Sequence, residues 1–308
     1  TQIGKGTQLA YEKPLIKIGD KEFLYEAIQP QEHPVLKDQK SIIKQLLKQD
    51  VLLHFPYQKF DHLIDFLRES AIDPKVKSIK INLYRVAKKS KIINALVNAV
   101  ENGKEVTVLV ELRARFDEQN NIRWANYLQE EGVKVTFGLP GLKVHSKLIV
   151  VSRLEGSVER KYAHVGTGNF NEKTANLYSD ISLLTCDPKI TNEVEKVFDF
   201  IYRPYFNRRF STLVLSPFNT RSKFINYLNE EIKNAMRAKD TVALESLRAV
   251  KSAILLALTE SDAKEELAQE YEIKLLQRLV KQRKDSAAIY VEQGRPDLAE
   301  PEVQQAAI

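Results

Sequence analysis

The stretch Val106-Thr107-Val108-Leu109-Val110-Glu111-Leu112 carries apolar residues on both sides of an extended chain. This pattern predicts a strand covered on both faces, as in a sheet that lies between layers of helices. Before this stretch in the sequence, apolar residues at 92–100 recur at helical spacing, and Gly103 ends the predicted helix. After it, a helix is predicted around residues 122–131 that ends at Gly132, followed by a strand at 133–137. Helices and strands therefore alternate, which predicts an α/β sandwich.

The same alternation extends outward in both directions. Helical spacing is present at 39–49, 60–67 and 190–201, and a short apolar run at 51–54 stops at Pro56. The remaining stretches that predict strands are 76–83, 147–151, 162–165 and 181–184.

The chain of 308 residues changes character near residues 218–240. Ten of the 11 glycines precede residue 220, and that part has 33 basic and 26 acidic residues, a net charge of +7. The part from residue 221 has 14 basic and 15 acidic residues. Such a shift predicts separate domains. We expect a linker or remnant of a preceding domain at 1–44, an α/β domain at 45–221 and a helical domain at 222–308.

The second part is amphipathic and helical throughout. Apolar residues recur at helical spacing over 224–235, 242–255 and 270–290, and the last stretch is ended by Gly294-Arg295-Pro296. Three helices in fewer than 90 residues predict a small all-α bundle.

Composition excludes several classes of protein. No apolar run is long enough to span a bilayer, and residues 1–13 contain no apolar core of a secretion signal. The single cysteine, Cys186, excludes an internal disulfide framework and a zinc site built from cysteines. We expect a cytoplasmic protein, with attachment to the periphery of the inner membrane left open.

The strongest chemical motif is His145-x-Lys147, which leads into a predicted strand. Residues two apart in an extended segment share a face, so both side chains are expected to point the same way. An imidazole can attack phosphorus, while a neighbouring ammonium neutralises phosphate oxygens. The alternative is a histidine with a purely structural role at the start of a strand.

A second motif, Gly166-Thr167-Gly168-Asn169-Phe170-Asn171, follows about 20 residues later. Its glycines, hydroxyl and amides predict a loop whose backbone N–H groups close around an anion, although a tight β-turn has the same composition. Together the two motifs resemble the active-site half of the phospholipase D superfamily. Ser152 stands where that superfamily carries an aspartate.

Longer stretches narrow the resemblance over about residues 20–230. They are Asp50–Tyr57, Ala71–Pro74, Leu83–Ala87, Ala114–Glu118, Gly141–Lys147, Gly166–Asn171 and Thr174-Ala175 with Tyr178. In this order they resemble the histidine-phosphorylating polyphosphate kinase family.

The resemblance implies reversible transfer of the terminal phosphoryl group of ATP to polyphosphate, with Mg²⁺ and through a phosphohistidine at His145. It also implies Arg85 and Arg115 as magnesium- or phosphate-associated residues and Tyr178 as a nucleotide contact. By their chemistry, Lys147, Asn169 and Asn171 are expected to bind phosphate oxygens. An Arg115–Asp117 ion pair and a core role for Tyr178 remain alternatives.

The sequence also departs from the family pattern. No histidine follows His164 and no second His-x-Lys occurs, whereas the family's last domain brings a second catalytic histidine and an arginine. Residues 225–308 instead resemble the GatB/YqeY family, through Asn229–Asp240, Leu247-Arg248, Lys281–Ser286 and Gly294–Ala299. The active site is therefore expected to be incomplete in this chain.

Three functions remain open from the sequence. They are a polyphosphate kinase, a module that binds phosphate, polyphosphate or tRNA without turnover, and a phospholipase-D-like phosphodiesterase. Weak tRNA affinity would involve Lys281, Arg283 and Lys284 of the C-terminal helices, where a solvated helix face is the alternative. A homo-oligomer is also left open.

Overall fold

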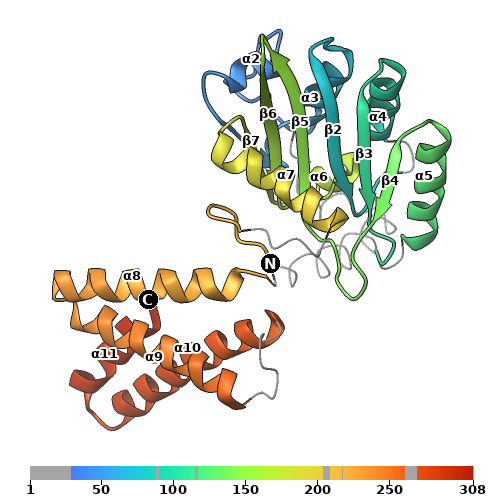
Figure 1. Cartoon of the computed structure of the whole chain (residues 1–308). Coiled ribbons are helices and arrows are strands. Elements are labelled where there is room, and N and C mark those ends of the chain that lie inside the picture. Colours follow the sequence, from blue (N-terminus) through green and yellow to red (C-terminus); the bar gives the residue numbers. More distant parts are fainter. Residues whose placement is uncertain are drawn as a thin grey trace, which may run out of the picture. The chain divides into compact units, whose positions relative to one another are not determined.

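The computed structural model describes residues 29–87, 90–114, 117–203, 209–216, 218–260 and 269–307. The chain divides into two compact units, the first ending at Thr212 and the second beginning at Leu213. The first unit is a mixed α/β structure and the second is helical (Figure 1). The fold class predicted from the sequence is therefore confirmed.

One seven-stranded sheet forms the centre of the first unit, in the order β1-β7-β6-β5-β2-β3-β4. β2, β3 and β4 run parallel, and all other neighbours in the sheet are antiparallel. The strands are β1 (Val51–Phe55), β2 (Val76–Leu83), β3 (Glu105–Val110), β4 (Lys134–Phe137), β5 (Lys147–Glu155), β6 (Val158–Gly166) and β7 (Asp180–Thr185).

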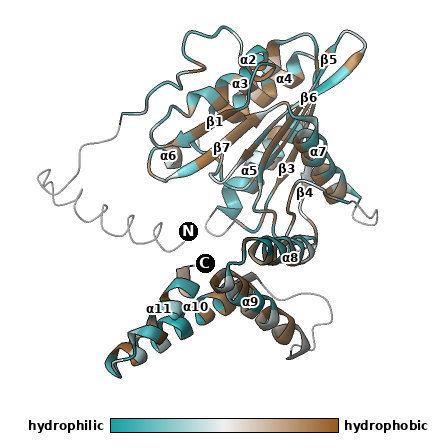
Figure 2. Cartoon of the chain, turned by 90° about the vertical axis from the view of Figure 1, so that its left-hand side faces the viewer, coloured by the Kyte–Doolittle hydropathy of each residue, from teal (hydrophilic) through white to brown (hydrophobic). Residues whose placement is uncertain are grey.

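Helices cover both faces of this sheet. α7 (Pro188–Tyr202) packs on β5 and β6, while α3 (Asp61–Ile72) and α4 (Lys91–Glu101) pack together on the opposite face (Figures 1 and 2). This coverage explains why five consecutive residues of β3, from Val106, are buried. The short helices α2 (Ile42–Leu46) and α6 (Glu172–Ala175) and the longer α5 (Glu118–Glu130), which packs beside β4, complete the unit.

At one edge of the sheet, the ends of five neighbouring strands lie in a row, from β7 to β3 in the order of the sheet. β2 and β3 end there, β5 begins opposite the end of β6, and β7 begins next to them. The residues at these ends are Leu83, Val110, Lys147, Gly166 and Asp180. We call this the His145 edge, because the loop before β5 carries His145. Ligands of α/β folds bind at the carboxyl ends of parallel strands, which here are those of β2 and β3.

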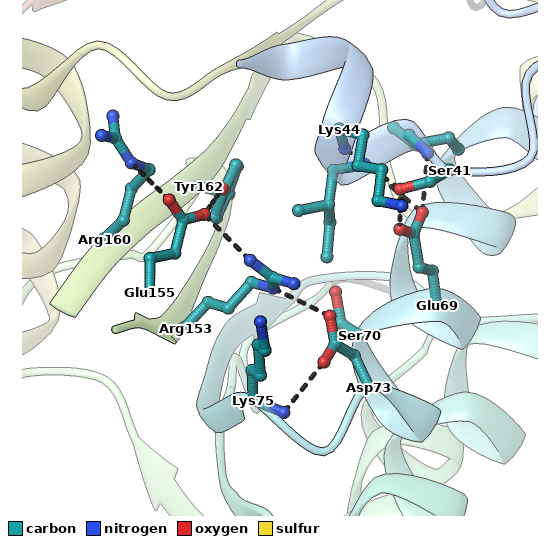
Figure 3. A network of polar contacts seen from close by, with 12 residues as sticks. Ser41, Lys44, Glu69, Ser70, Asp73, Lys75, Arg153, Glu155, Arg160 and Tyr162 are labelled. Carbon is teal, nitrogen blue, oxygen red and sulfur yellow. Dashed lines mark hydrogen bonds and ion pairs between the residues drawn. The ribbon is translucent and has the colours of Figure 1, made fainter. Parts of the chain in front are cut away.

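A polar network closes the opposite edge, where Figure 3 shows Arg153 of β5 between two carboxylates. Its Nε donates to Asp73 Oδ2 at 2.8 Å and its Nη1 to Glu155 Oε1 at 3.0 Å. Glu155 also accepts from Arg160 and from the hydroxyl of Tyr162. Burial raises the pKa of Glu155, but these donors outweigh it and leave the pKa below its ordinary value. The network ties the β5–β6 hairpin to the end of α3.

The second unit contains four helices in its described part: α8 (Thr220–Ala238), α9 (Thr241–Glu260), α10 (Gln269–Glu292) and α11 (Pro296–Ala307). The prediction of three helices was wrong, because α11 was not expected. Its proline at the first position suits a helix start, but Pro301 in its interior removes a backbone hydrogen bond. Packing of α11 on α9 and α10 and the Arg283–Glu302 ion pair at 3.0 Å offset that loss.

The helix predicted at 39–49 is also shorter than expected, since α2 covers only Ile42–Leu46. Ser41 caps it by accepting from the backbone N–H of Lys44 at 3.0 Å, and Glu69 of α3 accepts from Ile42 at 2.7 Å. Two side-chain acceptors at its first turn thus fix where the helix begins. No helix among the described residues is both long and apolar enough to cross a bilayer.

Candidate anion-binding site

The predicted nucleophile lies in the loop that enters β5 at the His145 edge. The imidazole of His145 is exposed, and its ring meets the Tyr84 ring edge to face, with centroids 4.8 Å apart and planes at 73°. Tyr84 follows β2 directly, so the end of β2 and the start of β5 provide this contact. An exposed imidazole at this edge is accessible to a phosphate group.

Lys147 is almost fully buried, at 3% exposure. Its ammonium stands 5.0 Å from the centroid of the Tyr84 ring and donates to the backbone carbonyl of His145. Both members of the His-x-Lys motif therefore contact the same ring. A buried ammonium next to an exposed imidazole supplies positive charge where solvent screens it least.

Asn82 holds the chain on both sides of Lys147. Its amide Nδ2 donates to the Ser146 carbonyl, and its Oδ1 accepts from the Leu148 backbone N–H at 2.6 Å. The side chain is buried within β2, at 2% exposure. Where the loop enters β5, the Asn82 side chain thus makes hydrogen bonds to the backbone in place of those between neighbouring strands.

Two further buried polar side chains shape the edge. Glu111, directly after β3, accepts from Val144 of the His145 loop at 2.7 Å and from Arg113 at 2.7 Å. Asn121 of α5 donates to the carbonyls of Tyr84 at 2.9 Å and Glu111 at 2.8 Å. The backbone at the ends of β2 and β3 is therefore held by side chains from other elements.

The glycine-rich loop from Gly166 to Asn171 packs against the start of β7. Thr167 donates from its hydroxyl to Asp180 Oδ1 at 2.9 Å, and its backbone N–H donates to Ile181 at 3.0 Å. A Cβ on Gly168 would meet Asp180 Oδ2 at 2.7 Å, so only glycine fits beside that buried carboxylate. The loop passes so close to Asp180 that no side chain fits at Gly168.

These contacts bear on the prediction that backbone N–H groups of the loop bind an anion. The N–H groups of Thr167 and Asn171 bond within the protein, and Asn171 Oδ1 caps α6 by accepting from Lys173 at 3.1 Å. The expectation that these backbone groups close around an anion is therefore wrong for Thr167 and Asn171. Asn169 differs, because its Oδ1 is buried without a hydrogen-bond partner.

The residues suggested by the family resemblance lie in different settings. The Arg85 guanidinium is 5.6 Å from the Tyr84 ring centroid, and its Nε pairs with Asp117 Oδ2 at 3.0 Å. Arg115 falls outside the described residues. Tyr178 is half-buried in the turn between α6 and β7, where its N–H donates to Thr174 at 3.1 Å. Arg85 and His145 therefore contact the same aromatic ring, that of Tyr84.

His164 of β6 has a different environment from His145. It is fully buried in β6, and its Nε2 lies 2.9 Å from the Ser182 hydroxyl. Burial lowers the pKa of His164 to about 3, so the ring is neutral at ordinary pH. Ser152, which stands at the aspartate position of the phospholipase pattern, is buried in β5 opposite Lys161.

Several residues of this site were not predicted from the sequence: Asn82, Tyr84, Glu111, Asn121 and Asp180. The sequence could have indicated Asn82 and Glu111, because each is a polar residue inside or directly after an apolar strand. Asn121 and Asp180 lacked one, since a polar residue in a helix or before a strand is ordinarily solvated.

Comparison with known proteins gives two family matches. The family described as polyphosphate kinase C-terminal domain 1 matches residues 41–207, more than half of the chain. The family described as Yqey-like protein matches residues 225–308.

Individual relatives agree with the first match. Polyphosphate kinases from Vibrio parahaemolyticus and Escherichia coli are 55% and 54% identical to this chain over 190 residues, which is 62% of the chain. The match covers 27% and 28% of the length of those two relatives. A crystal structure of polyphosphate kinase from Porphyromonas gingivalis has a TM-score of 0.63 and 35% identity, covering 70% of this chain and 36% of that one.

Proposed function

Because this chain belongs to the polyphosphate kinase family, we propose that its α/β unit binds phosphoanhydride oxygens at the His145 edge and that His145 accepts a phosphoryl group there. The observation that supports this most directly is the grouping of His145, Lys147 and Arg85 around the Tyr84 ring. A nucleophile and two cations in one place are what phosphoryl transfer requires.

In the proposed reaction an imidazole nitrogen of His145 attacks the terminal phosphorus of ATP. The bond from that phosphorus to its bridging oxygen breaks, and ADP leaves. A terminal oxygen of polyphosphate then attacks the phosphohistidine, and the phosphorus–nitrogen bond breaks. The buried ammonium of Lys147 and the guanidinium of Arg85 neutralise the phosphate oxygens during both steps.

Asn169 and Tyr178 have supporting roles in this proposal. The side-chain amide of Asn169 reaches a phosphate oxygen through its N–H₂ group, and its orphaned Oδ1 accepts from a bound donor. Tyr178, half-buried near the start of β7, contacts the nucleotide. The amide oxygen of Asn171 is engaged in capping α6, which leaves its N–H₂ group for phosphate.

The described residues contain no cluster of three or more His, Cys, Asp or Glu side chains that could hold a metal ion. A guanidinium has no lone pair for a metal, so Arg85 is proposed as a phosphate ligand. Mg²⁺ is commonly bound through the phosphates of its substrate.

We further propose that these 308 residues bind polyphosphate but synthesise it from ATP at a negligible rate. The YqeY match begins at residue 225, where the resemblance implies the domain with a second catalytic histidine, and no histidine follows His164. Losing one electrostatic contact in such a site typically costs a factor of about 10²–10³ in rate. Losing two therefore leaves little turnover.

The test measures tripolyphosphate binding by calorimetry at about 50 and 200 mM salt. We expect Lys147→Ala to weaken binding strongly, whereas Lys143→Ala, which removes an exposed lysine of the same loop, should have little effect. Binding should weaken as salt rises, because screening shortens the reach of the site's charge.

A second measurement uses ATP labelled in its terminal phosphate. Acid-labile, base-stable label that disappears in His145→Ala would identify the phosphohistidine. Robust polyphosphate synthesis by the purified chain, abolished by the same substitution, would refute the proposal of negligible turnover. Affinity equal in the wild type and Lys147→Ala would refute the binding site.

A further inference from the structure

Tyr84 touches three of the residues that the sequence places in the site. Its ring lies 4.8 Å from the His145 ring, 5.0 Å from the Lys147 ammonium and 5.6 Å from the Arg85 guanidinium. Tyr84 lies in the stretch Leu83–Ala87 that carries the family resemblance, but no role in the site was predicted for it from the sequence.

The tyrosine itself is held in place. Its side chain is 8% exposed, and its backbone carbonyl accepts from Asn121 Nδ2 at 2.9 Å. Asn121 is buried and also bonds the carbonyl of Glu111, so the position of Tyr84 is fixed relative to the end of β3. A fixed ring can define the geometry of the groups that touch it.

The ring acts on a cation and an imidazole at once. A buried ammonium needs compensation for its lost hydration, and the electron-rich face of an aromatic ring provides part of it. An edge-to-face contact likewise favours one orientation of the His145 ring. Lys147 and His145 thus contact the same ring, although Lys147 is buried and His145 is exposed.

We propose that Tyr84 is a positioning residue of the phosphoryl-transfer site, whose aromatic ring sets the imidazole of His145 against the ammonium of Lys147. This inference rests on the function proposed above. The aromatic ring performs this role and the hydroxyl is dispensable, so phenylalanine should replace tyrosine and an aliphatic residue should not.

The test uses the full chain and potassium phosphoramidate, a small donor that needs no nucleotide site. An imidazole nitrogen attacks phosphorus, the phosphorus–nitrogen bond of the donor breaks, and ammonia leaves with the proton. Peptide mass spectrometry separates His145 from the other four histidines and gives its rate of labelling. In Tyr84→Phe, His145 should be labelled at a rate within about twofold of the wild-type rate. In Tyr84→Leu, His145 should be labelled about tenfold more slowly than in the wild type.

Tyr127→Leu is the control, because Tyr127 is a half-buried tyrosine of α5 that also makes a T-shaped ring contact, with Trp124 at 5.7 Å. It should label at the wild-type rate. Thermal unfolding reports whether each variant folds, and Tyr84→Met takes the place of Tyr84→Leu if the latter does not.

Wild-type labelling of Tyr84→Leu or Tyr84→Met would overturn the inference. So would a Tyr84→Phe rate as low as theirs, or no labelling of His145 in the wild type. A wild type that is labelled at His145 but has no affinity for tripolyphosphate would instead refute the proposed function, and the comparison of Tyr84 variants would still decide the role of the ring.

Discussion

Asn82 places an amide inside an apolar strand, where an unpaired polar group is costly. Both of its polar atoms are used, one on the Ser146 carbonyl and one on the Leu148 N–H at 2.6 Å. Between these two contacts lies Lys147, the buried cation of the site. A side chain that stabilises the fold therefore also fixes a residue that is proposed to bind phosphate.

Asn82→Ala should lower the free energy of unfolding by about 2 kcal/mol, because it leaves buried backbone groups without partners. It should also weaken tripolyphosphate binding, since Lys147 is no longer held from both sides. Urea denaturation and calorimetry measure the two effects. Asn98→Ala, on the exposed side of α4, is the control and should change neither. Unaltered stability of Asn82→Ala would contradict the role of the amide.

His164 gives a prediction about pH at the same scale. Burial lowers its pKa in the folded state to about 3, from 6.5 in the unfolded chain. The unfolded state therefore binds an additional proton as the pH falls below 6.5, and stability is lost progressively down to about pH 3. Between pH 7.5 and 5.5 this group alone should lower the free energy of unfolding by about 1.4 kcal/mol.

His164→Gln removes that titration, so its unfolding free energy should fall less steeply over this range than that of the wild type. Urea denaturation at several pH values measures both slopes. The comparison between the two proteins cancels other groups, such as His62, whose pKa is also lowered by burial. Equal slopes would show that His164 is not the group responsible.

At the scale of elements, the β5–β6 hairpin is fixed at its two ends by different means. At the His145 edge it is held by Asn82, and at the opposite edge by Arg153 between Asp73 and Glu155 (Figure 3). Burial raises the pKa of Asp73, but the hydrogen bonds from Arg153 and the Lys75 backbone, together with the charges of Arg153 and Lys104, outweigh it and leave a net lowering. Both carboxylates thus share the guanidinium of Arg153.

Arg153→Met should lower the free energy of unfolding by about 3 kcal/mol, because it leaves the half-buried carboxylate of Asp73 without its ion-pair partner and removes one of the two guanidinium groups that pair with Glu155. Arg68→Met is the matched control: Arg68 pairs with Asp65 at 3.2 Å on an exposed helix face and should contribute less than about 1 kcal/mol. Chemical denaturation measures both. Equal losses in the two variants would contradict the network's role.

At the scale of the whole molecule, the chain joins two units with separate cores. The α/β unit contains Trp124, the single tryptophan of the chain, on α5. The helical unit has its own buried residues, among them Leu228 of α8. Tryptophan fluorescence therefore reports on the first unit, while circular dichroism reports on helices of both.

Leu228→Ala should destabilise the helical unit by about 3 kcal/mol, through the cavity left in its core. The thermal transition seen by circular dichroism should shift, while the transition of Trp124 fluorescence and the affinity for tripolyphosphate should not. Leu96→Ala, in the buried core of α4, is the converse control and should shift the fluorescence transition. A common shift of both signals in Leu228→Ala would show that the units unfold together.

Sequence patterns determined the order of elements and the chemical motifs of this protein. The apolar residues of β3 predict a sheet covered on both faces, because burial of both faces leaves no polar alternation. The His145-x-Lys147 motif is similarly local. α11 escaped prediction because Pro301 is unfavourable in a helix, and only packing on α9 and α10 compensates for it.

Tertiary structure alone decided which side chains surround His145. Asn82 and Glu111 hydrogen-bond the loop that carries His145, while Asn121 bonds the carbonyls of Tyr84 and Glu111. These contacts depend on how the strands pair. The ion pair between Arg85 and Asp117 at 3.0 Å was likewise not indicated by the sequence. Periodicity records which face of an element is buried, but it carries no information on which buried polar groups meet, because that depends on the register between strands.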